Sequence, residues 1–190
     1  HWRLRQAQAL FEAGRSGRAR SLARSLADTD QQVPATLLRV RILVEQNNLT
    51  QARALLDTLL GRNLADPQRA RALQLLGRIH TSQDRPGNAF DAYIGQYRLL
   101  ESAADRQATH EAIWQSLQAM AEERLRQRLE RTRQALPRGY LRFAVIMRGV
   151  GERPVDETRR LLEQWLSAFP DHPLGTIVSK RMERVQAGPL

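Results

Sequence analysis

A helix-turn-helix unit that recurs along the chain constrains the fold more than any other feature of the sequence. The small residue of its second helix recurs at Ala19, Ala52 and Ala89, at intervals of 33 and 37 residues. In residues 69–100, Gly77 supplies the small position of the first helix, which lets two antiparallel helices approach closely. One helix pair cannot bury its apolar face alone, so stacked pairs form a solenoid. The pattern therefore predicts a tetratricopeptide-like (TPR-like) array, an architecture that usually serves binding or spacing.

Large residues stand beside the small ones in the same unit. Leu76, His80 and Tyr93 occupy the positions where a TPR fills the space next to the close contact. We therefore expect His80 to serve packing rather than chemistry. The same helical spacing of apolar residues predicts four buried side chains: Leu76, Ala89, Trp114 and Trp165.

Helical periodicity runs through the whole chain, and no strand-like alternation persists. We expect about eleven helices in one all-α, TPR-like superhelix over residues 1–190, elongated, with more regular repeats in residues 1–101 and irregular helices in residues 102–190. Thr50 and Asp66 are expected to cap helices, the latter ahead of a proline at the first helical position. Pro137 and Gly139 are expected to separate a helix that ends near residue 135 from one over residues 140–148.

The charge of the chain is strongly basic, with a formal net charge of +10. The first 80 residues hold 13 arginines and 6 acidic residues, whereas the remainder holds 17 basic and 14 acidic residues. Such a surface attracts anions, namely nucleic acid, anionic lipid or acidic polymers. The alternative is a solvated surface of Arg/Glu pairs at helical spacing, and both interpretations stay open.

The sequence lacks both cysteine and an apolar segment long enough to span a membrane. There is no cysteine, so disulfides and thiolate chemistry are excluded. The longest apolar run, residues 143–147, is far shorter than the ~20 residues that span a bilayer. Because the chain starts at His1 without an initiator methionine or a signal peptide, we expect it to be part of a longer protein.

The densest basic run lies in residues 124–133. Glu130 stands at helical pair spacing from Arg126 and Arg133, which favours a solvated helix face. Binding of single-stranded nucleic acid would need stacking aromatics, and none lies between Trp114 and Tyr140. A nucleic-acid partner is therefore not expected.

No pattern of residues predicts catalysis, a cofactor or a metal site. None of the histidines His1, His80, His110 and His172 has a second histidine at zinc-ligand spacing. The adjacent pair of acidic residues at 122 and 123 points to different sides of a helix, so the two cannot face each other across a glycan. No nucleophile motif and no glycine-rich phosphate loop is present, and we expect a protein that is not an enzyme.

The concave face of the predicted array offers a binding groove. With Gly77 at the small position, the register places five polar residues on that groove from successive first helices. Arginines there can hold carboxylates through two hydrogen bonds each, although the same residues can simply face water. The predicted groove residues are Gln8, Arg41, Arg71, Gln74 and Arg78.

Three segments in the second half of the chain follow one another in an unusual order. Residues 110–120 read H-E-A-I-W-Q-S-L-Q-A-M, residues 139–144 read G-Y-L-R-F-A, and residues 162–175 read L-E-Q-W-L-S-A-F-P-D-H-P-L-G. This order resembles the amino-terminal domain of the LpoA-type lipoproteins, in which I/T-W-Q-x-L, G-W-L and W-x-x-x-[YF]-P-x-[NH]-P recur. The matching positions are Ile113, Trp114, Gln115, Leu117, Gly139, Leu141, Trp165, Phe169, Pro170, His172 and Pro173.

The resemblance implies a function that the residues alone do not. Proteins of this family are outer-membrane activators of bifunctional penicillin-binding proteins, held in the periplasm by a lipidated cysteine upstream of the helical domain. For this chain the resemblance implies the non-catalytic helical arm, since the family's carboxy-terminal half is absent. The chain also departs from the family at Tyr140, where the family prefers tryptophan. Two alternatives remain open, a generic TPR adaptor and the helical superstructure of a lytic transglycosylase.

Overall fold

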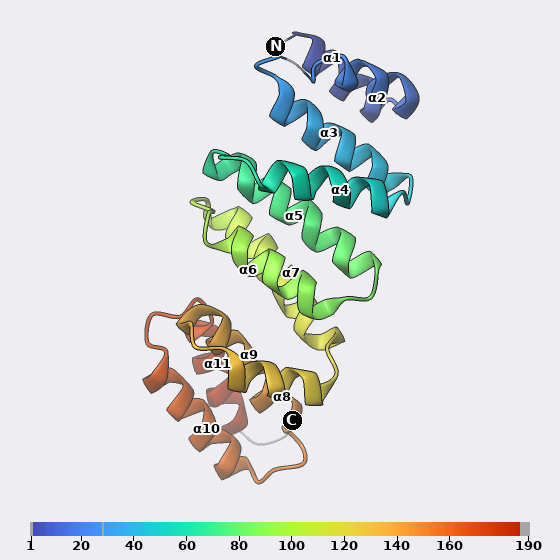
Figure 1. Cartoon of the computed structure of the whole chain (residues 1–190). Coiled ribbons are helices and arrows are strands. Elements are labelled where there is room, and N and C mark those ends of the chain that lie inside the picture. The colour runs from blue at the N-terminus through green and yellow to red at the C-terminus, as the bar shows by residue number, and fades with distance from the viewer. Residues whose placement is uncertain (1, 28, 187–190) are drawn as a thin grey trace. The chain divides into compact units, whose positions relative to one another are not determined.

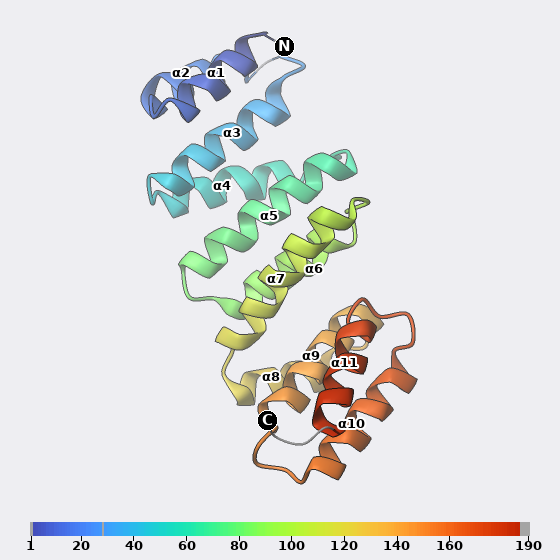
Figure 2. The ribbon, with the colours of Figure 1, turned by 180° about the vertical axis from the view of Figure 1, so that it is seen from behind.

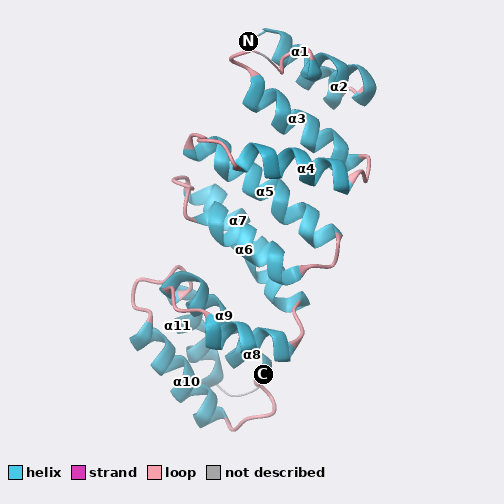
Figure 3. Ribbon diagram, in the orientation of Figure 1, coloured by secondary structure: helices cyan, strands magenta, loops and turns pink. Residues whose placement is uncertain are grey.

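The computed structural model describes residues 2–27 and 29–186, and these fold into eleven helices without a strand (Figures 1 and 3). The prediction of an all-α, TPR-like fold is confirmed. A lone β-bridge joins Val150 and Arg153. The helices are α1 Trp2–Glu12, α2 Ser16–Arg24, α3 Gln32–Glu45, α4 Leu49–Leu60, α5 Asp66–Ser82, α6 Pro86–Tyr97, α7 Ala103–Ala119, α8 Glu122–Arg131, α9 Ala135–Arg148, α10 Val155–Ala168 and α11 Gly175–Gln186.

The chain divides into two compact units, which we call the first unit (His1–Ile113) and the second unit (Trp114–Leu190). The division falls inside α7. One continuous domain over residues 1–190 and an elongated form stay predictions.

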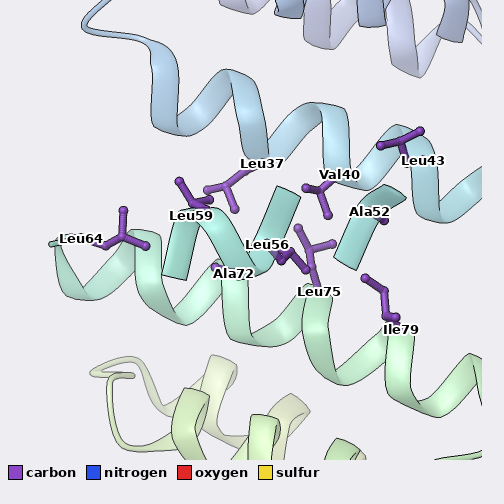
Figure 4. Close-up of a cluster of buried hydrophobic side chains, with 10 residues drawn as sticks. All are labelled: Leu37, Val40, Leu43, Ala52, Leu56, Leu59, Leu64, Ala72, Leu75 and Ile79. Atoms are coloured by element: carbon purple, nitrogen blue, oxygen red, sulfur yellow. The ribbon is translucent and has the colours of Figure 1, made fainter. Parts of the chain in front are cut away.

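Helix α3 joins two hydrophobic clusters among the described residues of the first unit. Ala35, Leu38 and Ile42 pack with α1 and α2, whereas the opposite side of α3 packs with α4 and α5. Figure 4 shows this second cluster, in which side chains of α3, α4 and α5 point into the space between the three helices. A helix with two buried faces is what a stack of helices requires, because each repeat covers its neighbour. Figures 1 and 2 show α1 to α6 following one another in this way.

The small residues of the repeat lie at the close contacts, as predicted. Ala19, Ala52 and Ala89 have no exposed surface. A Cβ atom added to Gly77 would lie under 3.0 Å from three atoms of the Tyr93 ring, so α5 and α6 meet at a distance that only glycine allows at this position.

Two of the four predicted core residues are only half buried. Ala89 and Trp165 are fully buried, but Leu76 and Trp114 are of intermediate exposure. In α5 the helix turns about 100° per residue, and Leu75 rather than Leu76 enters the cluster shared with α3 and α4. Leu76 packs against the edge of that cluster.

Three helix starts differ from the prediction. Thr50 lies inside α4, after an Asn48 cap residue whose side chain makes no capping hydrogen bond. Asp66 is the first residue of α5 rather than its cap, so the helix begins one position earlier than expected, and again no side chain caps the helix. Pro137 and Gly139 do not separate two helices but lie within α9. A proline in the first turn is tolerated because its missing N–H would have no partner there in any case.

The second unit is built around aromatic rings from α9, α10 and the loop that follows. Trp165 packs edge-on against His172, with ring centroids 5.1 Å apart, and Tyr140 packs against the same imidazole at 4.8 Å. The indole N–H of Trp165 donates to the Gly139 carbonyl oxygen at 2.8 Å. On the other side of this unit, Arg148 donates to the carbonyls of residues 117, 118 and 120, which satisfies acceptors that the end of α7 leaves free.

Candidate functional site

A cavity of about 400 Å³ lies within the first unit, between the start of α5, the end of α6 and the start of α7. Its lining residues all fall in the range 66–109 and combine charged, amide and aliphatic side chains. They are Asp66, Pro67, Ala70, Arg71, Gln74, Gln96, Leu99, Leu100, Glu101, Ser102, Asp105, Ala108 and Thr109.

The local sequence explains why polar groups gather here. Asp66 and Asp105 lie in the first turns of α5 and α7, where a carboxylate is favoured by the positive end of the helix. Helix α6 ends at Tyr97, and the residues after it, Leu99 to Ser102, cross from one helix to the other and complete the wall.

Two hydroxyl groups in the cavity wall are already engaged by the backbone. The Ser102 hydroxyl accepts a hydrogen bond from the Asp105 amide, with 3.4 Å between oxygen and nitrogen. The Thr109 hydroxyl donates to the Asp105 carbonyl oxygen at 2.9 Å. These two hydrogen bonds hold the first turns of α7 in place.

The remaining polar groups of the cavity have unused hydrogen-bonding capacity. Gln96 is 5% exposed, and its Oε1 atom is buried without a hydrogen-bond donor. Among the described residues, no ion pair involves the carboxylates of Asp66, Glu101 and Asp105. The Arg71 guanidinium also forms no ion pair with a described residue. The cavity wall therefore carries three exposed carboxylates and one exposed guanidinium, whereas the unpaired amide oxygen of Gln96 is itself closed to solvent.

The five predicted groove residues are all exposed, but only two share this cavity. Arg71 and Gln74 line it, while Arg78 lies one turn further along α5 outside the lining. Arg41 pairs with a carboxylate one turn along α3 at 3.9 Å, and its guanidinium lies 4.9 Å from the centroid of the Phe11 ring. Gln8 is an exposed residue of α1. That these five form one binding groove stays a prediction.

Two residues of this cavity, the buried Gln96 and the exposed Asp105, escaped sequence reasoning. Gln96 follows Tyr93 on α6, and nothing in its spacing separates it from a solvated glutamine. Asp105 carries the ordinary signal of an acidic residue in a first helical turn. Only the packing of three helices brings the two to one cavity.

The surroundings of His80, His110 and His172 are those of structural side chains. Burial, followed by the charges of Arg53 and Arg85, lowers the pKa of His80, whose Nδ1 atom is buried without a partner. Burial also lowers the pKa of His110. The Leu174 amide donates to Nδ1 of His172 at 3.1 Å, so Nε2 carries the proton.

That proton of His172 bonds the Leu136 carbonyl oxygen at 2.8 Å, which gives the imidazole a packing role between α9 and the loop after α10. His1 lies outside the described residues. Among the residues that are described, no group of three or more potential metal ligands occurs.

The basic run of residues 124–133 is a charged helix face in which Arg126 pairs differently from the prediction. Arg126 bonds Glu122 on the preceding turn rather than Glu130 on the next one. Glu122 lies in the first turn of α8, so its carboxylate also meets the positive end of that helix. The hydrogen bond from Arg126 lowers the pKa of Glu122. None of the helices described in the structure is long and apolar enough to cross a bilayer.

Comparison with known proteins places the chain in a family. The profile of the family described as "LppC putative lipoprotein" matches residues 1–187. A protein named penicillin-binding protein activator LpoA from Klebsiella pneumoniae is 33% identical over 127 residues, which cover 65% of this chain and 18% of that protein. Its namesake from Pantoea ananatis is 24% identical over 190 residues, which cover 97% of this chain and 27% of that protein. The chain thus spans about a quarter or less of these two relatives.

Solved structures agree on the fold. The amino-terminal domain of E. coli LpoA superposes with a TM-score of 0.71 at 26% identity, over 92% of this chain and 78% of that one. The amino-terminal domain of Haemophilus influenzae LpoA superposes with a TM-score of 0.75 at 19% identity, over 100% of this chain and 86% of that one. Since the family profile covers nearly every residue, the chain belongs to the LppC lipoprotein family and has the fold of LpoA amino-terminal domains.

Proposed function

We propose that this chain is the amino-terminal helical arm of an envelope lipoprotein that activates a bifunctional penicillin-binding protein. The observation that carries the proposal is the family match over residues 1–187, together with relatives that are named activators of penicillin-binding proteins. The arm acts in the periplasm, tethered to the outer membrane by a lipidated cysteine that precedes it in the intact protein.

The proposed role of the arm is mechanical and non-catalytic. In the first unit α3 packs against α1 and α2 on one side and against α4 and α5 on the other, and such a stack supplies interaction surface along its length. We assign the stimulation of the synthase to a part of the intact protein other than these residues.

The basic surface of the first 80 residues is proposed to contact anionic envelope material, either peptidoglycan carboxylates or anionic lipid headgroups. The support is the excess of 13 arginines over 6 acidic residues there. Of the three arginines in the predicted groove, Arg41 and Arg78 are exposed and lie outside the cavity.

The test is a glycan-polymerisation and transpeptidation assay with the penicillin-binding protein of a relative. Residues 1–190 alone are expected to leave both rates unchanged, while the full-length Klebsiella pneumoniae activator raises them. Full stimulation by residues 1–190 would show that the activity belongs to this arm and would overturn the assignment.

A further inference from the structure

We propose that the helix pair α1 and α2 docks on the surface of an anionic lipid bilayer. Arginines of the pair contact the lipid phosphate groups, and the exposed ring of Trp2 lies at the level of the headgroups. Figures 1 and 2 show the pair at one end of the helices of the first unit. The inference rests on the proposed function, since it narrows the contact with anionic envelope material to one partner and one surface.

The arginines of this helix pair outnumber its acidic residues. Helix α2 has three arginines and no acidic residue, whereas α1 has two arginines and one acidic residue, and the connection between them adds one more arginine. Five of the six are exposed. Clusters of about four to eight basic residues on an amphipathic helix are typical of proteins that bind anionic lipid. The six are Arg3, Arg5, Arg15, Arg18, Arg20 and Arg24.

These arginines lack the carboxylate partners that arginines have elsewhere in the chain. In α3, α4, α8 and α10, arginines pair with carboxylates one turn away. Among the described residues, no ion pair involves any of the six arginines of α1, α2 and their connection. The positive charge of the pair is therefore not neutralised from within the described chain, and it attracts an anionic surface.

Three arginines come together where α2 packs against α3. Arg20 donates to Oε1 of Gln46, just after α3, at 3.5 Å. Arg24 lies one turn further along α2, and Arg39 lies two turns before Gln46 on the same face of α3. Because the chain reverses direction between the two helices (Figure 1), Arg24 and Arg39 approach each other. Burial, followed by the charges of Arg24 and Arg20, lowers the pKa of Arg39.

An exposed aromatic ring accompanies this charge. Trp2, in the first turn of α1, is 67% exposed, and the guanidinium of Arg3 lies 5.7 Å from its ring centroid. The short connection between α1 and α2 makes the two helices antiparallel, so Trp2 lies at the same end of the pair as Arg24. Tryptophan is enriched at membrane interfaces because its ring is apolar while its N–H is polar.

The charge and the ring together favour a bilayer over the other anionic partners. Peptidoglycan carboxylates can pair with the arginines, but they offer no apolar layer to the indole of Trp2. Single-stranded nucleic acid binds where successive bases stack on several aromatic side chains. The helix pair has one further aromatic residue, Phe11, and it is buried.

The experiment is sedimentation of the whole chain with lipid vesicles. Neutral vesicles contain phosphatidylcholine alone, and anionic vesicles contain phosphatidylcholine and phosphatidylglycerol in equal amounts. We expect the chain to bind the anionic vesicles at least about ten-fold more tightly, and the binding to weaken as salt rises. Tryptophan emission should shift to shorter wavelength on binding. The shift reports Trp2, because Trp165 is buried and Trp114 is half buried.

Two variants locate the contact on the helix pair. Changing Arg5, Arg18 and Arg24 to Gln removes three exposed charges and should weaken binding to anionic vesicles at least about ten-fold. Trp2→Ala should weaken it about three-fold and abolish the emission shift. The matched control changes three exposed arginines of the second unit to Gln and should bind like the original chain. The control residues are Arg124, Arg131 and Arg133.

Three results would overturn the inference: equal binding to both kinds of vesicle, equal binding by the helix-pair and control arginine variants, or an emission spectrum that vesicles leave unchanged. Tighter binding to purified peptidoglycan or to a single-stranded oligonucleotide than to anionic vesicles would overturn it as well. The peptidoglycan result would still support the proposed contact with anionic envelope material. The stimulation assay of the proposed function is run without vesicles, so the two proposals fail separately.

Discussion

The two units of this chain solve the same packing problem with different side chains. The first unit buries alanines, leucines and isoleucines in clusters that share α3, and its close contacts rest on residues without bulk, such as Gly77. The second unit buries Trp165, Tyr140 and His172 around hydrogen bonds to backbone carbonyls. The first arrangement can be repeated along a chain, whereas the second depends on one set of partners. The units should therefore differ in how they respond to substitution.

The largest effect is expected from Trp165→Ala in the second unit. The substitution removes a fully buried indole and leaves the Gly139 carbonyl oxygen without its donor. We expect a loss of about 3–5 kcal/mol in the free energy of unfolding, measured by chemical denaturation. The control is Trp114→Ala, which should lose less because Trp114 is half buried. A loss under ~1 kcal/mol for Trp165→Ala would contradict the proposed core of this unit.

A glycine pair sharpens the comparison inside the first unit. Gly77→Ala adds a methyl group against the Tyr93 ring, and overpacking of this kind costs about 1–3 kcal/mol. Gly17→Ala in α2 adds the same group where nothing lies within 4 Å, so it should stabilise the protein by up to about 1 kcal/mol. Thermal denaturation of the two variants should show shifts of opposite sign. Equal shifts would mean that the close contact of α5 and α6 is not specific.

The next effect is a dependence of stability on pH that comes from His80. Because its folded-state pKa is lowered from the ordinary 6.5, the unfolded chain binds a proton more readily than the folded one. This contribution to stability is complete above pH 6.5 and is lost as the pH falls toward the lowered folded-state value. The groups that face His80 are Arg53 and Arg85, which lower its pKa, and Asp57 and Asp91, which raise it.

The measurement is the melting temperature as the pH falls from about 7.5 to 5. His80→Leu should lose less stability over that interval than the original chain does. An identical loss in both would show that His80 does not carry the effect. His110, which burial also keeps from protonation, provides the residual dependence expected in the variant.

The smallest effect concerns the basic groove. A variant with Arg41, Arg71 and Arg78 changed to Gln should bind less peptidoglycan or fewer anionic vesicles in a sedimentation assay. The binding should weaken as salt shortens the Debye length from ~10 Å at 0.1 M to ~3 Å at 1 M. Unchanged binding would leave these arginines as a solvated surface, and stability should hardly move because all three are exposed.

The sequence predicts the first unit well because its packing follows a period. Gly77, Ala52 and Ala89 lie at the predicted contacts. Small residues at a fixed interval indicate close helix packing, because few other arrangements require them there. The prediction for Leu76 in α5 was wrong, since Leu75 enters the cluster and Leu76 packs at its edge, because two adjacent leucines leave the choice between them open.

Sequence reasoning failed where the structure depends on contacts far apart in the chain. Pro137 marks the first turn of α9 rather than a break, because a helix start depends on what precedes the proline. The contacts of Gly139 with Trp165 and His172 explain why those positions carry the family resemblance. The spacing of these residues in the sequence does not predict the contacts. The cavity around Gln96 needed three helices to be placed before it could be seen.

The most direct test of the account is a chimera in which residues 1–190 replace the aligned amino-terminal part of the Pantoea ananatis activator. The measurement is stimulation of glycan polymerisation and transpeptidation by the penicillin-binding protein of that organism. If the chain is the non-catalytic arm of such an activator, the chimera stimulates both rates as the native activator does. A chimera that folds but leaves both rates at the level of the unstimulated enzyme would contradict the account.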